Sequence, residues 1–182
     1  VAVMQRPQTL RVVADTDAVI STPGTWVRGD FYTDPSVPNA VLRVSDVLSK
    51  INAGLEVRLI TTTGDITMEA AISSSPQAGS LTLDAGQDTY LRDDIKLAGA
   101  TSSVVVKAAR NIITTNGTSG DYREFWSNDG NLVFWANSND NGQGTVLLPN
   151  YTELKSNGGD IHIAGGAATS SGGVQVPGGY AV

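Results

Sequence analysis

A short alternating pattern that recurs along the chain constrains its fold more than any other feature of the sequence. In each copy, a small or polar residue precedes two apolar residues that are separated by one position, and Ala or Gly often follows. The steps between successive copies are 15, 23, 28 and 29 residues. The first apolar residues of the five copies are Ile66, Leu81, Val104, Leu132 and Ile161.

The alternation predicts short β-strands with one apolar face, because successive side chains of a strand point to opposite sides. A single strand of this kind cannot bury its apolar face, whereas a stack of such strands can. Steps of roughly 20 to 30 residues let a coil of several short strands return above its own start. The pattern therefore predicts an all-β chain folded as a β-solenoid. The unequal steps predict insertions at the corners, which protrude as loops.

Further strands are expected between the copies of the pattern. Asn-Gly steps such as Asn116-Gly117 and Asn157-Gly158 are typical of tight turns, and in a solenoid they would mark the corners. We expect the many Asn side chains at these corners to stack into ladders, with their amides satisfying one another. The strands expected between the copies are 89–91, 112–114 and 145–148.

The first part of the chain has a different pattern. Strands are predicted at 9–14, 40–44 and 55–61, and a Pro-containing loop at 23–38 lies between the first two. Residues 1–44 are interpreted as the start of the solenoid or as a preceding coil. Residues 45–182 are interpreted as parallel coils of a longer chain.

One short helix is predicted at 46–53. Ser45 is a suitable N-cap, Asp46 complements the positive end of the helix, and Gly54 is a typical C-terminal stop. The apolar residues that share one face of this helix are Val47, Leu48 and Ile51.

Composition excludes several classes of protein. The chain has no cysteine, which excludes disulfides, cysteine-based metal sites and cysteine nucleophiles. Its net charge is −6 and its 12 Lys and Arg residues are scattered, which argues against nucleic-acid binding. No run of about 18 apolar residues predicts a membrane helix. The chain starts at Val1 without a signal-peptide pattern and finishes at 178–182 without a cap, so both ends are interpreted as cuts through a longer polypeptide.

From residue 45 onward, five short motifs follow one another. They are LSKINAG at 48–54 followed by Val57, TGDITM at 63–68, LTLDAGQDTYL at 81–91, NLVFWANS at 131–138, and NGGDIHIAGG at 157–166. In this order they resemble the filamentous-haemagglutinin-like exoproteins, which are large bacterial surface adhesins. Two departures are Thr89, where the family usually has an apolar residue, and the bulky pair Phe134-Trp135. Residues 1–44 match the family less well.

The resemblance implies a right-handed parallel β-helix, an extracellular or cell-surface location and a role in cell adhesion. The export-signal domain of that family is not evident, so an internal segment is implied. The resemblance transfers no catalytic residue, and neither a cofactor nor a metal is expected.

The ionisable residues offer few candidates for chemistry. His162 alternates with two apolar residues and is predicted to lie on the outer face. Asp93 and Asp94, with Asp84 and Asp88 nearby, form the densest acidic cluster. Adjacent carboxylates on an extended segment point to opposite sides, so a corner is the favoured interpretation. Calcium binding or acid–base catalysis remain the alternatives.

Exposed aromatic residues are candidates for contact with a partner, because aromatic rings stack on sugars and anchor protein interfaces. The segment 122–126 is predicted to be an outward loop. Phe134 and Trp135 are adjacent on a predicted strand, so one is expected in the core and the other outside. The residues proposed to bind a ligand or partner are Tyr122, Phe125, Trp126, Trp26 and Tyr32.

Three hypotheses for function follow. The first is a structural or adhesive rod segment of a large secreted surface protein, which is not an enzyme. The second is a carbohydrate-active enzyme, such as a polysaccharide lyase or a tailspike-like hydrolase, on the same scaffold. The third is a subunit of an extracellular filament or sheath that self-associates end to end. Expected partners are neighbouring coils of the same chain and a host or cell-surface glycan or protein. Neither nucleic acid nor membrane insertion is expected.

Overall fold

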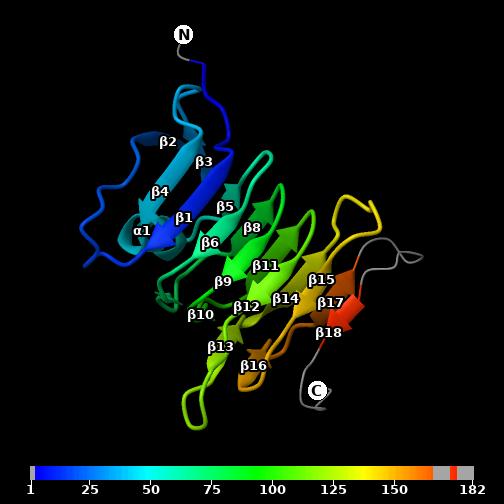
Figure 1. Cartoon of the computed structure of the whole chain (residues 1–182). Coiled ribbons are helices and arrows are strands. Elements are labelled where there is room, and N and C mark those ends of the chain that lie inside the picture. The colour runs from blue at the N-terminus through cyan, green and yellow to red at the C-terminus, as the bar shows by residue number, and fades with distance from the viewer. Residues whose placement is uncertain (1–2, 166–172, 176–182) are drawn as a thin grey trace.

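The computed structural model describes residues 3–165 and 173–175, and within them the chain is built mainly of β-strands with one short helix (Figure 1). The predictions for both chain ends, and for residue 166 of the last motif, lie outside this part. No helix among the described residues is both long enough and apolar enough to cross a membrane. The all-β prediction is confirmed.

The strands form three sheets, which we call A, B and C. Sheet A runs in the order β17 (Ile161–Gly165), β14 (Asp129–Ala136), β11 (Ser102–Ala108), β8 (Leu81–Ala85), β5 (Val57–Ile60), β3 (Asp30–Thr33) and β2 (Gly24–Val27). Sheet B runs in the order β18 (Gly173–Gln175), β15 (Thr145–Leu147), β12 (Ile112–Thr114), β9 (Thr89–Leu91), β6 (Ile66–Met68), β1 (Thr9–Val13) and β4 (Asn39–Arg43). Sheet C runs in the order β16 (Thr152–Lys155), β13 (Arg123–Trp126), β10 (Ile95–Lys96) and β7 (Ile72–Ser73).

Three successive strands form one repeat unit, which contributes one strand to each sheet. The units are β5–β6–β7, β8–β9–β10, β11–β12–β13 and β14–β15–β16, and β17–β18 begins the next. Within the described residues, every strand pair is parallel except the hairpin of β2 and β3. This arrangement is consistent with a solenoid-like fold.

The alternating pattern sets the register of sheet A. Leu81 pairs with Val104, Val104 with Leu132, and Leu132 with Ile161, as the four copies predict. The fifth predicted copy is wrong, because Ile66 lies in sheet B and pairs with Thr89. The residue equivalent to Leu81 in the first unit is Val57.

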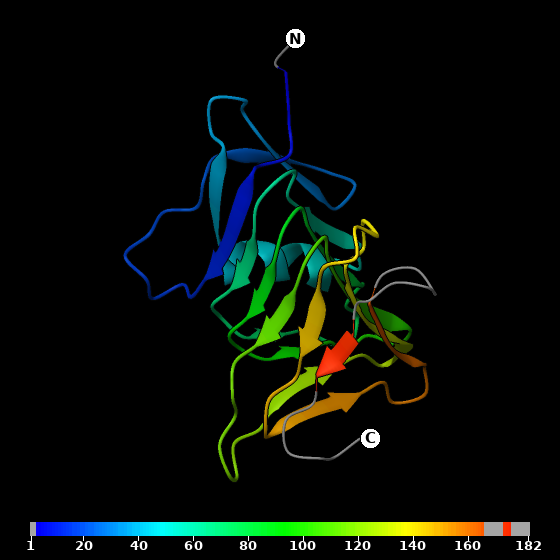
Figure 2. The same cartoon turned by 45° about the vertical axis from the view of Figure 1, so that its right-hand side comes forward.

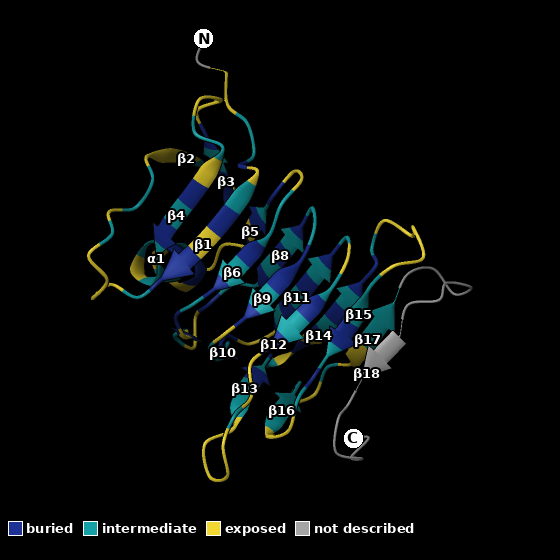
Figure 3. Ribbon diagram, in the orientation of Figure 1, coloured by how far each residue is buried: buried dark blue, intermediate teal, exposed yellow. Residues whose placement is uncertain are grey.

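The apolar faces of the three sheets meet in one core. Along β8, β11 and β14, buried residues alternate with partly exposed ones (Figure 3). The rings of Phe125 and Phe134 meet edge to face at 5.6 Å between centroids and link sheets C and A. Phe134 is fully buried while Trp135 faces outward, so the opposite orientations predicted for this pair are confirmed. The three strands predicted between the copies are β9, β12 and β15.

The longer steps between copies arise at corners, as predicted. Residues 115–122 connect β12 to β13, and residues 137–144 connect β14 to β15. The equivalent connections in the second unit are the shorter segments 92–94 and 86–88. Both long connections project away from the sheets at opposite ends of the strands (Figure 1).

Side chains at the corners do form ladders between units, although not by amide-to-amide stacking. At the corner before sheet A, the Ser80 hydroxyl accepts the Ser103 N–H at 3.0 Å, and the Ser103 hydroxyl accepts the Asn131 N–H at 3.0 Å. Asn131 Oδ1 then accepts the Asp160 N–H at 3.1 Å. Each side chain therefore bonds the backbone of the next unit, which extends the hydrogen bonding of the strands around the corner.

The N-terminal part continues two of the sheets. β1 pairs in parallel with β6 and β4, while β3 pairs with β5. The region predicted as a loop at 23–38 instead contains the hairpin of β2 and β3, which turns at Arg28 and Gly29. Both turn residues have positive φ, a geometry that two-residue hairpin turns favour. The Pro residues that suggested a loop flank this hairpin.

Helix α1 (Val44–Asn52) lies at the same end of the stack as β1 and β4 (Figure 2). The predicted cap is wrong, because Arg43 occupies the N-cap position without a side-chain hydrogen bond to the helix. Gly54, with φ of 79°, confirms the predicted stop. Asn52 Oδ1 accepts the Ser75 N–H at 2.8 Å, next to β7. The helix therefore sits beside β7, the last strand of sheet C.

Candidate functional site

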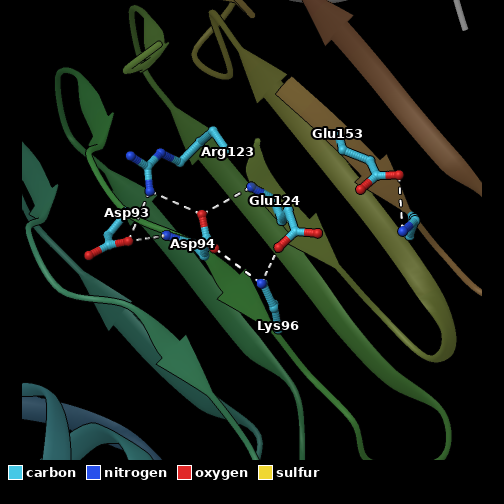
Figure 4. A network of polar contacts seen from close by, with 7 residues as sticks. Asp93, Asp94, Lys96, Arg123, Glu124 and Glu153 are labelled. Carbon is cyan, nitrogen blue, oxygen red and sulfur yellow. Dashed lines mark hydrogen bonds and ion pairs between the residues drawn. The ribbon is translucent and has the colours of Figure 1, made fainter. Parts of the chain in front are cut away.

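The predicted acidic cluster lies at the corner before β10. Arg123 Nη1 donates to Asp93 Oδ1 at 2.9 Å and to Asp94 Oδ1 at 3.0 Å (Figure 4). On the other side, Lys96 Nζ pairs with Asp94 Oδ2 at 3.2 Å and also donates to Glu124. The two carboxylates are therefore held by cations of two successive units.

The electrostatics of this cluster favour the charged forms. Burial alone would raise the pKa of Asp94, but the Glu124 N–H, Lys96 and Arg123 hold it below its ordinary value. The hydrogen bond with Glu124 raises the pKa of Lys96. A general acid at neutral pH needs a raised carboxyl pKa, so the shift of Asp94 is opposite to that requirement.

Trp126 stands beside this network on the outer face of sheet C. Lys96 Nζ lies 4.9 Å from the centroid of its ring and Lys155 Nζ lies 4.4 Å from it. These lysines come from the strands on either side of β13, and Lys155 also pairs with Glu153 at 3.0 Å. The ring is thus flanked by cations from both neighbouring strands.

The other two aromatic residues of 122–126 lie in different surroundings, one in the core and one at the surface. The expectation that Phe125 contacts a partner is corrected, because its ring is fully buried in the core. The predicted loop is in fact β13, whose pairing with β10 and β16 turns Phe125 inward. Tyr122 is 48% exposed and packs edge to face on Tyr151, with 5.7 Å between ring centroids.

Trp26 and Tyr32 lie on the N-terminal hairpin, far along the stack from β13 (Figure 1). Trp26 packs on Phe31 with 5.2 Å between ring centroids. The Tyr32 hydroxyl donates to Asp30 at 3.2 Å, and Arg6 lies over its ring. The structure therefore does not bring these two residues together with Tyr122 into one site.

Two further ionisable candidates are Asp88 and His162. Asp88 is buried and is bound by Arg110 Nε at 2.8 Å and by Asn111. Burial alone would raise the pKa of Asp88, but these hydrogen bonds lower it.

His162 is exposed on the outer face, as predicted. The described residues contain no group of three or more His, Cys, Asp and Glu side chains placed to hold a metal ion.

A groove on the outer face of sheet A was missed by the sequence analysis. Its volume is about 390 Å³, within the usual range of ligand pockets. Its residues come from four successive repeat units, so they are scattered along the sequence. The groove is lined by Ile60, Thr61, Asp84, Ala85, Gly86, Lys107, Ala109, Trp135, Ser138 and Asn139.

The register of sheet A creates one side of this groove. Ile60 pairs with Asp84, Asp84 with Lys107, and Lys107 with Trp135, so the four side chains form one outward column. Lys107 Nζ lies 5.3 Å from the centroid of the Trp135 ring. Trp135 Nε1 is shielded from solvent, and the described residues supply no acceptor for it. The column thus combines an aromatic surface, a cation and an anion.

Comparison with protein-family models, with curated proteins and with solved structures finds no match to this chain.

Proposed function

We propose that this chain is a right-handed parallel β-helix that serves as a stiff structural and adhesive segment of a large secreted bacterial surface protein. The observation that carries the proposal is the in-register pairing of successive repeat units in all three sheets. In such a stack each unit is hydrogen-bonded to its neighbours in all three sheets. Load applied along the stack is then shared by many parallel backbone hydrogen bonds.

The corners strengthen the case for a load-bearing stack. Side-chain ladders at two corners bond the backbone of each unit to the next, in addition to the strand hydrogen bonds. At the second of these corners, Asp65 Oδ1 accepts the Asp88 N–H at 3.0 Å, and Asn111 Oδ1 accepts the Thr145 N–H at 3.1 Å. A stack that is bonded through its corners as well as its strands resists bending and splaying.

The distribution of charge also favours a non-catalytic role over a carbohydrate-active enzyme. Glycosidases need one carboxyl group kept protonated near neutral pH and a second one ionised beside it. Here Asp88 and Asp94 are paired with cations that lower their pKa values. This supports a structural role for these acids.

The adhesive contact is assigned to the exposed aromatic pair Tyr122 and Tyr151, which lies at the corner where the parallel strands β13 and β16 begin. One such pair would bind weakly, and many copies on a surface would add avidity. The test is the attachment of beads coated with this chain to bacterial and host cells. We expect attachment to rise steeply with coating density.

The double variant Tyr122→Ser, Tyr151→Ser should remove most of this attachment without unfolding the chain. The matched control is Ile20→Ser, which removes a side chain that is 85% exposed in the N-terminal part. Attachment that is absent at every coating density, or that survives the tyrosine variant unchanged, would contradict the adhesive role. An experimental structure that shows left-handed coiling would contradict the proposed architecture.

A further inference from the structure

We propose that the groove beside Trp135 binds an uncharged, extended β-linked glycan whose chain runs along the stack of repeat units. The inference builds on the proposed surface role and names a ligand class for a second site, separate from the tyrosine pair. It rests on the column of outward residues in sheet A, on the connection that overhangs it and on the balance of charge within it.

The spacing of the column suits a polymer. Ile60, Asp84, Lys107 and Trp135 are in register on four neighbouring strands. Neighbouring strands lie about 4.8 Å apart, which is close to the rise per sugar of an extended β-1,4-linked chain. Successive sugars would therefore lie beside successive repeat units, and alternate sugars would have the same orientation. An α-linked chain that coils would lose this match.

The opposite side of the groove is a shaped wall. Ser138 and Asn139 belong to the long connection after β14, which has no equivalent in the shorter corner of the second unit. The connection is held in place because Asn137 Oδ1 accepts the Asn141 N–H at 3.0 Å. Gly86 lies at the equivalent corner of the second unit, where a Cβ atom would meet the Thr62 backbone at 2.5 Å. The corners of the first two units are thus closely packed on each other.

The chemistry of the lining is that of sugar recognition. Asp84 can accept hydrogen bonds from hydroxyl groups, while Lys107 and the Asn139 amide can donate to them. Trp135 lines the groove with its indole, and Lys107 Nζ lies 5.3 Å from the centroid of that ring.

The charge of the groove selects an uncharged chain. Among the lining residues, Asp84 carries one negative charge and Lys107 carries one positive charge. Recognition of sulfate or carboxylate groups requires an excess of cations, usually with a bidentate arginine. No arginine lines this groove. A sulfated or uronate-rich chain would therefore meet as much repulsion as attraction.

The experiment is isothermal titration calorimetry of the whole chain with four hexasaccharides: cellohexaose, chitohexaose, maltohexaose and a heparin hexasaccharide. We expect cellohexaose or chitohexaose to bind, and maltohexaose and the heparin hexasaccharide to bind at least about tenfold more weakly. Trp135→Ala should weaken binding by about tenfold or more. Asn139→Arg, which places a bulky side chain in the groove from an exposed position, should do the same.

The matched control is Trp126→Ala, which removes the indole on sheet C and should leave glycan binding unchanged. Urea unfolding of each variant shows that the fold is retained. The proposal is overturned if neither β-linked hexasaccharide binds, if maltohexaose or the heparin hexasaccharide binds as tightly, or if Trp135→Ala and Asn139→Arg leave binding intact. The bead assay depends on Tyr122 and Tyr151 and not on this groove. A negative calorimetric result would therefore leave the adhesive proposal standing, and the two proposals can be contradicted independently.

Discussion

Asp88 Oδ1 accepts the backbone N–H of Asn111, 2.9 Å away, at the equivalent corner of the next repeat unit. Asn111 also donates its side-chain amide to the same oxygen at 3.0 Å, and its own Oδ1 accepts the Thr145 N–H of the unit after that. Asp65 accepts from Asp88 in the same manner. One polar position per unit therefore links four units at this corner.

The first prediction concerns the amide of Asn111. Asn111→Asp keeps the acceptor for Thr145 but replaces the donor to Asp88 with a second negative charge. Loss of the hydrogen bond and like-charge repulsion should lower the free energy of unfolding by about 1–2 kcal/mol. Urea unfolding at pH 7 measures the change.

The matched control is Asn131→Asp at the corner before sheet A. Asn131 is exposed and its Oδ1 accepts the Asp160 N–H, an acceptor role that an aspartate oxygen can also fill. The control should stay within about 0.5 kcal/mol of the wild type. Equal losses in the two variants would show that the amide of Asn111 is not what stabilises its corner.

The second prediction concerns the buried carboxylate of Asp88, whose side chain is 2% exposed. Asp88→Ala leaves the Asn111 N–H without its acceptor and Arg110 without its partner. Because Arg110 is itself largely solvated, we expect a loss of about 2–3 kcal/mol, less than for a fully buried pair. Asp84→Ala, on the outward face of β8, should cost less than about 0.5 kcal/mol. If the two variants unfold at the same urea concentration, the corner ladder does not stabilise the stack.

The third prediction is a loss of stability in acid. The pKa values of Asp30, Asp88 and Asp94 lie below the ordinary value of 3.8, because cations and N–H donors outweigh the effect of burial. The unfolded chain therefore binds protons before the folded one does. The stabilisation is fully present above the unfolded pKa, and it is lost as the pH falls through the folded values. Urea midpoints should be flat between pH 7 and about pH 5 and should fall steeply below about pH 4.

A variant tests the cause of this pH dependence. Asp88→Asn should flatten the acid limb, because one of the depressed pKa values is gone. If the urea midpoint of the variant falls as steeply below about pH 4 as that of the wild type, the loss of stability in acid comes from the general rise in positive charge instead.

The register of sheet A could be predicted from the sequence because each strand carries its own alternation. Leu81, Val104, Leu132 and Ile161 all start such strands and pair as expected. Ile66 was placed with them because a period of two identifies a half-buried strand without saying to which sheet it belongs. The hairpin of β2 and β3 was missed since its turn, Arg28-Gly29, lacks the Asn-Gly or Asp-Gly signal.

The groove could have been found from the same register. Its column consists of the residues three positions after each sheet A marker: Ile60 after Val57, and likewise Asp84, Lys107 and Trp135. This spacing was not recognised in the sequence because the first sheet A marker was assigned to Ile66 and not to Val57. The inward turn of Phe125 could not be predicted while 122–126 was interpreted as a loop, because a loop has no alternation that assigns faces.

The last prediction compares two lysines that flank Trp126. Both lie within 5 Å of the ring centroid, so Lys96→Met and Lys155→Met each remove one cation–π contact. Lys96 also separates Asp94 from Glu124, and its removal leaves these two partly buried carboxylates facing each other. Among the described residues, the ion pair of Lys155 is with Glu153, which is 37% exposed. We expect Lys96→Met to cost about 1–2 kcal/mol and Lys155→Met about 0.5–1 kcal/mol.

The difference between these two variants should depend on pH, because protonation of Asp94 removes the repulsion. Sheet C would then regain part of its stability in Lys96→Met as the pH approaches the carboxyl range, while Lys155→Met would follow the wild type. Because the pKa of Asp94 lies below its ordinary value, parallel urea titrations of the two variants at pH 7 and about pH 3.5 measure this difference. Equal losses at both pH values would mean that the lysines act only through Trp126. The network at the corner before β10 would then add nothing to the pairing of the units.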